Sequence, residues 1–449
     1  MKTASKALLA ALFVLNVYRA ATQSLVHDEA FTWQLYLNGP ISAIFTQYDA
    51  NHHFLATLLM RLSTRLFGFS ELALRLASLL AGGWYFITIF RLAVLAFGEG
   101  WRLLLAVALA ALNPLVLDFL VAARGYGIAL ACLMYGLYSI VRFLTQPKPA
   151  RSLLVRASIS FGFAVMANLT FLIPVMAIAA LVFVLRRAEW KPMLLPLAAL
   201  LLLFLLISPI LQARPSSFYY GASTLTQSFQ VLAAESLAHN EGLGRLNREA
   251  AWKPWWRIAA IVACGAIVLA SLRIREPLPR IAAVTIIASW CALFVAHHAT
   301  GLLYPADRTG LYFLPLAGLL IACMAARSRL VAVFAILIAA EYALQLNWTH
   351  FYVWQYDADN RAILQFLAAR KPAGPMRLGT SWPLDPSLSY YRDRLHLAWL
   401  PPLNRQGPDG DYDYYILTEQ DQDRIQRHGL EVIYRGAASG MVLAVRGHG

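Results

Sequence analysis

The sequence predicts an α-helical polytopic membrane protein, with about eleven spans and a small C-terminal extracytoplasmic α/β domain. Three observations lead to this fold class. The chain is 59% hydrophobic and only 14% charged, whereas soluble domains are about 45–50% apolar and about 25% charged. Arg and Lys recur in alternate loops between the apolar runs, and the composition becomes polar after Leu346. A bilayer acting as the solvent accounts for the apolar excess.

The spans are predicted from apolar runs that approach the roughly 20 residues needed to cross a bilayer. Several runs are shorter than this, which allows one or two of them to be re-entrant or tilted. The eleven candidate spans are residues 4–22, 73–97, 103–117, 126–143, 153–167, 170–185, 193–211, 256–272, 281–296, 310–326 and 330–346.

The first run has an alternative interpretation. Lys2 and Lys6 precede a short apolar stretch, which also resembles a signal peptide. Cleavage would remove the first span and leave the rest of the charge pattern intact.

The basic residues define the orientation. If the N-terminus is cytoplasmic, every second loop is basic, as the positive-inside rule requires. These loops carry Arg102; Arg142, Lys148, Arg151 and Arg156; Arg186, Arg187 and Lys191; Arg273, Arg275 and Arg280; and Arg327 and Arg329. The net charge of +14 is therefore distributed over the cytoplasmic side of the inner or plasma membrane and does not indicate nucleic-acid binding.

This orientation predicts the domain organisation. A transmembrane domain, residues 1–346, has long outer loops at 23–72 and 212–255. An extracytoplasmic α/β domain, residues 347–449, follows it. The expected strands of this domain are residues 376–381, 414–418 and 440–445. Its expected helices are residues 362–370 and 419–427.

The first outer loop begins with an acidic pair, Asp28-Glu29, in a chain where charge is scarce. Nearby aromatic residues, Phe31 and Trp33, suit a helix at the membrane interface. The pair is a candidate for catalysis, and it is also compatible with a solvated loop end.

Three stretches of the sequence resemble the C-type glycosyltransferase superfamily (GT-C), especially its branch of protein O-mannosyltransferases and lipid A aminoarabinose transferases. An acidic pair follows the first span in that branch, as Asp28-Glu29 does here. Later in the loop, "NHHFLATLLMRLSTRLFGFSELALRLAS" (residues 51–78) is similar to a family segment, although His53 and Phe54 replace the family's prolines.

The second and third stretches are "NPLVLDFLVAARGYGIAL" (113–130) and "YPADRTGLYFLPL" (304–316). The second resembles a family stretch that ends in Ala-Arg-x-Tyr, carried here by Arg124 and Tyr126. Many members place an acid two residues before this Arg. This chain has Ala122 there, and Asp118 is the nearby acid.

The resemblance implies an inverting glycosyltransferase that takes a sugar from a polyprenyl-phosphate carrier outside the membrane. Asp28 or Glu29 would be the base that accepts the acceptor's proton, and the sequence leaves open which of them it is. The implied substrate-binding residues are His52, His53, Asp118, Arg124, Tyr126, Tyr304 and Arg308, in which Arg and His would stabilise the phosphate. His297 and His298 are weaker candidates.

The expected partners are the lipid-linked sugar, membrane lipids and an acceptor that is protein, lipid or glycan. No cofactor and no metal site are expected, and the four cysteines lack metal-ligand spacing. Asp357-Ala358-Asp359 resembles a nucleotide-sugar motif, but the orientation places it outside the cell. The alternatives are a transporter or flippase of a lipid-linked saccharide, or a non-catalytic membrane scaffold.

Overall fold

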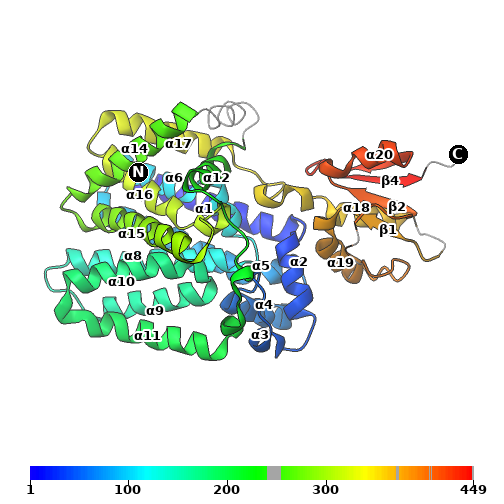
Figure 1. Ribbon diagram of the computed structural model, residues 1–449. Helices are drawn as coiled ribbons and strands as arrows, with labels where there is room; N and C mark the ends of the chain where they lie inside the picture. The colour runs from blue at the N-terminus through cyan, green and yellow to red at the C-terminus, as the bar shows by residue number, and fades with distance from the viewer. Residues whose placement is uncertain (240–253, 371–373, 404, 406, 447–449) are drawn as a thin grey trace.

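The membrane-spanning part is a bundle of long helices. The computed structural model describes residues 1–239, 254–370, 374–403, 405 and 407–446. A helix lies over each predicted span (Figure 1). These helices are α1 (Lys2–Thr22), α5 (Glu71–Phe97), α6 (Trp101–Ala111), α8 (Gly125–Thr145), α9 (Ser152–Ala167), α10 (Leu172–Leu185), α11 (Trp190–Ile207), α14 (Pro254–Leu272), α15 (Pro277–Thr300), α16 (Phe313–Ala325) and α17 (Arg329–Leu344). Part of the predicted outer loop, residues 240–253, lies outside the described residues.

Helix α8 lies at the centre of the packing, against α5 on one side and α9 on the other. Gly136 of α8 allows the close approach of α9, because a Cβ atom at this position would lie 2.2 Å from the Phe161 ring. Small residues at helix contacts are typical of membrane bundles. Within the described part of the chain, five helices (α1, α5, α8, α15 and the segment Arg187–Ile207) are long and apolar enough to cross a membrane.

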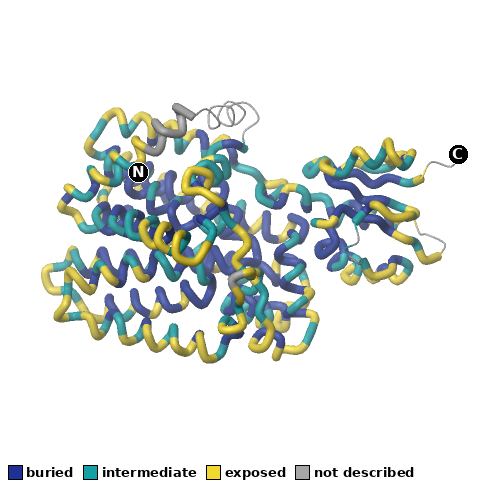
Figure 2. The backbone as a smooth tube through the Cα atoms, in the orientation of Figure 1, coloured by how far each residue is buried: buried dark blue, intermediate teal, exposed yellow. Residues whose placement is uncertain are grey.

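The outer surface of the bundle is apolar. Figure 2 shows exposed residues along α11, which lies at the edge of the bundle. They include Leu206, which is 73% exposed, and Leu337 of α17 is 58% exposed. Such a surface would be a large hydrophobic patch in water and is the expected surface in lipid. The predicted multi-pass membrane fold is therefore confirmed.

The predicted span 103–117 is two helices rather than one. Helix α6 ends at Ala111, and α7 (Pro114–Phe119) begins after Asn113. The Asn113 side chain accepts a hydrogen bond from the backbone N–H of Val116 at 3.1 Å, and Pro114 occupies the first helical position. Asn at the N-cap followed by Pro is a strong signal for the start of a helix. The apolar residues on both sides of this pair led to the prediction of one continuous span.

Helix α1 is an integral part of the bundle. It packs against α5 and α6, and its buried Arg19 forms an ion pair with buried Asp118 of α7. The other oxygen of Asp118 accepts a hydrogen bond from the backbone N–H of Tyr352 at 2.7 Å. Removal of α1 would leave Asp118 buried without its cation.

The C-terminal region is a small α/β unit beside the bundle (Figure 1). Its sheet has the strand order β1-β2-β4-β3, with β1 parallel to β2 and the other neighbours antiparallel. The elements are β1 (Leu378–Thr380), β2 (Tyr414–Leu417), β3 (Leu430–Arg435), β4 (Val442–Arg446), α18 (Asn360–Ala369), α19 (Asp385–Arg394) and α20 (Asp423–Arg427). Strand β3 was not predicted, because this bulged edge strand carries Glu431 and Arg435 and lacks a clear alternation.

Candidate active site

The acidic pair lies on α2 (His27–Thr32), a short helix directly after α1. Its first turn is fixed from two directions. Glu29 accepts a hydrogen bond from the backbone N–H of Val26 at 3.1 Å, and Asp357 accepts one from the backbone N–H of His27 at 2.6 Å. The start of the helix is therefore held both by its own sequence and by the segment that leads into the C-terminal region.

Glu29 is turned away from the solvent and fully paired. Arg75 of α5 donates two hydrogen bonds to it, from Nε to Oε1 at 2.9 Å and from Nη2 to Oε2 at 2.6 Å. The backbone N–H of Ala123 donates a third at 2.5 Å, and both side chains of the ion pair are 0% exposed. A carboxylate with all these partners is positioned to hold α2 against α5 and the segment that precedes α8, and all its lone pairs are occupied by protein donors.

Asp28 is also buried, but its carboxylate has more distant partners. Its Oδ2 atom lies 3.8 Å from Nη2 of Arg124 and 3.6 Å from Nη2 of Arg308. These distances allow ion pairing but exceed a hydrogen bond, and Oδ2 has no hydrogen-bond partner in the described part of the chain. Burial favours a raised pKa for Asp28, but Arg308 and Arg124 outweigh it and hold the pKa below the ordinary value. Asp28 is thus a carboxylate between two guanidinium groups.

Arg124 is the N-cap residue of α8 and is fixed by hydrogen bonds. Its guanidinium donates to the Asn51 side chain at 2.5 Å, to the Asn51 carbonyl at 3.2 Å and to the Thr32 hydroxyl at 3.3 Å. The following Gly125 allows the end of α9 to approach closely, because a Cβ atom there would lie 1.9 Å from the Ala167 carbonyl oxygen. The side chain is only 2% exposed.

Arg308 enters from a different part of the chain, the short helix η6 (Asp307–Gly310). Its guanidinium lies over the Tyr220 ring, 4.2 Å from the ring centroid, and its side chain is 16% exposed. The neighbouring Asp307 accepts hydrogen bonds from the Tyr220 hydroxyl and from the Arg308 backbone. Asp307 adopts φ 37°, in the left-handed region that few residue types other than glycine, asparagine and aspartate adopt.

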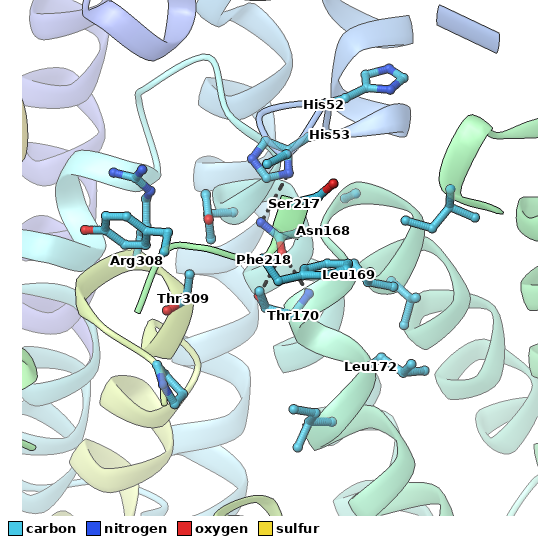
Figure 3. A pocket seen from close by; sticks show the side chains of 18 of the residues that line it. His52, His53, Asn168, Leu169, Thr170, Leu172, Ser217, Phe218, Arg308 and Thr309 are labelled. Atoms are coloured by element: carbon cyan, nitrogen blue, oxygen red, sulfur yellow. Dashed lines mark hydrogen bonds between the residues drawn. The ribbon is translucent and has the colours of Figure 1, made fainter. Parts of the chain in front are cut away.

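A cavity of about 570 Å³ adjoins these two arginines (Figure 3). Its polar end is lined by Asn51, His52, His53, Arg124 and Arg308. Its walls are apolar and come from α10, α11 and α15, with Leu172, Ile173, Phe204, Leu293 and Ala296. Asp28 touches both lining arginines. The cavity therefore suits an amphiphile with an anionic head.

The two histidines differ in their surroundings. His52 stacks on Tyr36, with ring centroids 4.2 Å apart, and burial lowers its pKa to about 4. His53 packs its ring edge against Tyr126 at 5.0 Å and lies within hydrogen-bond distance of Asn168 at 3.3 Å. Both histidines and Tyr126 line the cavity.

Two of the predicted binding residues lie outside this lining. Asp118 is paired with Arg19 and the Tyr352 backbone, so it does not replace the acid that the family places near Arg124. Tyr304 stacks on His297 at 4.4 Å and exchanges backbone hydrogen bonds with Ala222. His298 is exposed on α15. The structure thus brings together Asp28, His52, His53, Arg124, Tyr126 and Arg308 and leaves Asp118 and Tyr304 in structural contacts.

The Asp357-Ala358-Asp359 motif has a structural explanation. Asp357 is 0% exposed and accepts hydrogen bonds from the backbone of His27 and, at 2.8 Å, from the side chain of Asn360. Asp359 accepts from the backbone N–H groups of Ala438 and Ser439 at 3.0 and 2.8 Å. Both carboxylates connect segments of the protein, which gives the motif a structural role.

Sequence reasoning missed Asn51, Asn168 and Tyr220. Asn51 orients Arg124, Asn168 contacts His53, and Tyr220 supports Arg308. Asn51 opens the segment that resembles the family, and this position was the available signal for it. No comparable local pattern distinguishes Tyr220.

The comparisons with known proteins agree with this fold. Residues 51–212, less than half of the chain, match the model of a family described as dolichyl-phosphate-mannose-protein mannosyltransferase. Together with the fold, this match confirms the resemblance to the C-type membrane glycosyltransferases that the sequence predicts.

Two solved structures are similar to this chain to different degrees. ArnT from Cupriavidus metallidurans, bound to undecaprenyl phosphate, has a TM-score of 0.50 at 13% identity, over 99% of this chain and 98% of ArnT. The oligosaccharyltransferase from Archaeoglobus fulgidus has a TM-score of 0.45 at 14% identity, over 90% of this chain and 58% of the enzyme. No curated protein sequence matches the chain. At such identities, the ArnT comparison shows a shared fold.

Proposed function

We propose that this protein is an inverting glycosyltransferase, which moves a sugar from a polyprenyl-phosphate carrier to an acceptor on the extracytoplasmic side of the membrane. One observation carries the proposal. The Asp28 carboxylate lies between Arg124 and Arg308, and these two arginines line the polar end of a cavity whose walls are apolar. A base, two phosphate-binding groups and a surface for an isoprenoid chain are thereby placed together.

The cavity matches the two parts of such a donor. The isoprenoid chain would pack against the walls formed by Leu172, Phe204 and Leu293. The phosphate would bind Arg124 and Arg308, because a guanidinium offers two parallel N–H donors to phosphate oxygens. ArnT, which shares the fold, has been solved with undecaprenyl phosphate bound, and the proposal extends this class of ligand to the present chain.

The geometry supports a single-displacement reaction. The acceptor hydroxyl oxygen attacks the anomeric carbon, while the bond from this carbon to the phosphate oxygen breaks. The electron pair of that bond stays on the phosphate, where Arg124 and Arg308 stabilise the charge, and the hydroxyl proton passes to Asp28. The reaction needs no nucleotide cofactor.

The arginines also control the base. In the free protein they hold the pKa of Asp28 low, so the carboxylate is ionised at neutral pH. A bound phosphate draws the two guanidinium groups toward itself and weakens their pairing with Asp28. The pKa of Asp28 then rises, and the carboxylate becomes a better base when the donor is present.

Arg308 provides the cleanest test of the phosphate site, because Arg124 also holds Asn51 and Thr32 in place. We expect Arg308→Ala to raise the KM for the lipid-linked donor about tenfold or more. Arg308→Lys should recover only part of the loss, because lysine keeps the positive charge but lacks the two parallel N–H donors of arginine. The measurement is steady-state transfer by purified protein. Arg275→Ala, at an exposed position in a predicted cytoplasmic loop, is the matched control. Unchanged donor KM in Arg308→Ala would remove this residue from the donor site.

The orientation is tested by reporter fusions. We expect an alkaline phosphatase fused after Arg370 to be active, because the basic loops place the C-terminal region outside. The same enzyme fused after Arg151 should be inactive. Activity at Arg151 and none at Arg370 would contradict both the orientation and the outer active site.

A further inference from the structure

Asn168 lies in the wall of the cavity, directly after α9 (Figure 3). Its Oδ1 atom accepts hydrogen bonds from the backbone N–H of Thr170 at 3.0 Å and from the Thr170 hydroxyl at 2.7 Å. A backbone N–H can only donate, so this contact fixes which end of the amide is oxygen. The amide nitrogen Nδ2 therefore faces Nδ1 of His53, at 3.3 Å.

This contact determines where the proton of His53 resides. The amide nitrogen of Asn168 can only donate, so Nδ1 of His53 must accept and carries no proton. Burial, and after it the positive charge of Arg124, hold the pKa of His53 well below its ordinary value. The ring is therefore neutral. The single ring proton is therefore on Nε2.

The Nε2–H group is an unused donor. Nε2 is buried, and the described ranges of the chain contain no hydrogen-bond partner for it. His53 is 9% exposed and lines the polar end of the cavity, as Arg308 does. A buried donor without an acceptor is unfavourable, and an anion in the cavity would supply the acceptor.

We propose that Asn168 is a positioning residue that holds His53 as the Nε2–H tautomer, so that His53 donates a hydrogen bond to the phosphodiester of the bound lipid. The inference rests on the proposed function, because it assumes a lipid phosphodiester in the cavity. The charged or titratable groups that face His53 are Arg124, Arg308, His52 and Tyr126. A neutral donor adds a hydrogen bond beside two guanidinium groups without adding a third positive charge.

Asn168→Asp tests the tautomer directly. In this variant, one carboxylate oxygen can still accept hydrogen bonds from Thr170. The other oxygen can only accept, so a hydrogen bond with His53 requires a proton on Nδ1 of the ring. The negative charge of the carboxylate also raises the pKa of that ring. Above this raised pKa, the neutral ring presents a lone pair at Nε2 to the phosphate. Below it, both ring nitrogens carry protons and donation is restored.

The readout is the Kd of the purified protein in detergent for farnesyl methyl phosphate diester. This probe has one constant negative charge and requires no knowledge of the sugar. Between about pH 5.5 and about pH 8.5, we expect a flat Kd for the wild type. For Asn168→Asp, we expect the Kd to weaken about tenfold or more as the pH rises through the same range.

Two controls separate the tautomer from other effects. In His53→Gln/Asn168→Asp, the added carboxylate remains but the titrating ring is gone, so the pH dependence should disappear. If Asn168→Asp does not fold, His53→Gln alone still tests the proposal, because its amide N–H can replace the Nε2–H donor. We expect His53→Gln to bind the probe better than His53→Ala, while exposed His298→Ala matches the wild type.

A pH-independent Kd in folded Asn168→Asp, or equal binding by His53→Gln and His53→Ala, would overturn the tautomer assignment and leave the proposed function standing. Failure of the wild-type protein to bind the probe at any pH would overturn both.

Discussion

Asp28→Asn is expected to lower the turnover of sugar transfer about 10²–10⁴-fold, the usual loss when a general base is removed. The amide has the size of the carboxylate but cannot accept the acceptor's proton. Because Oδ2 of Asp28 makes long ion pairs and no hydrogen bond in the described structure, the change should disturb the fold little. The measurement is transfer by purified protein, with the Kd for the phosphodiester probe determined in parallel.

The binding measurement makes this test specific. Loss of the negative charge leaves Arg124 and Arg308 less neutralised, so Asp28→Asn should bind the anionic probe at least as tightly as the wild type. Loss of turnover with retained probe binding supports a base. Full turnover in Asp28→Asn would contradict the assignment of Asp28 as the base.

Arg75→Ala is expected to lower the free energy of unfolding by about 3–5 kcal/mol, because it leaves Glu29 as an unpaired charge at a fully buried position. The substitution also removes the donors to the backbone carbonyls of Gln23 and Ser24, which connect α1 to α2. The change is measured by SDS-driven unfolding of the purified protein in mixed micelles.

Arg361→Ala is the matched control for this experiment. Arg361 is 35% exposed and pairs with Glu71 at 3.2 Å. A partly exposed pair of this kind contributes about 0–1 kcal/mol. Equal destabilisation by the two arginine variants would show that the buried Glu29 pair has no special structural role and would reopen Glu29 as a candidate base.

The helical bundle could be predicted from the sequence because each span is an apolar run, and membrane helices satisfy their backbone hydrogen bonds internally. The break between α6 and α7 was missed, since only the Asn113-Pro114 pair marks it within an apolar run. Strand β3 was missed for the opposite reason: its residues are too polar and too exposed to show a strand pattern.

The charged residues of the candidate site could be singled out from the sequence. Asp28, Arg124 and Arg308 are distant in sequence, but each is conspicuous in a chain with few charges and lies in a stretch that resembles the same superfamily. The sequence could not distinguish Asp28 from Glu29, because adjacent residues on a helix point in different directions and the partner Arg75 lies on another helix. The same reason applies to Asp118, whose partner Arg19 lies on α1.

Transfer in proteoliposomes tests the central claim most directly. Purified protein would be reconstituted with a panel of undecaprenyl-phosphate sugars and a membrane extract as the source of acceptor, and free undecaprenyl phosphate would be quantified. We predict its release from at least one donor by the wild type, with strong reduction in Asp28→Asn and Arg308→Ala. Movement of an intact lipid-linked sugar between leaflets without cleavage, unaffected by Asp28→Asn, would contradict the account and identify a transporter instead.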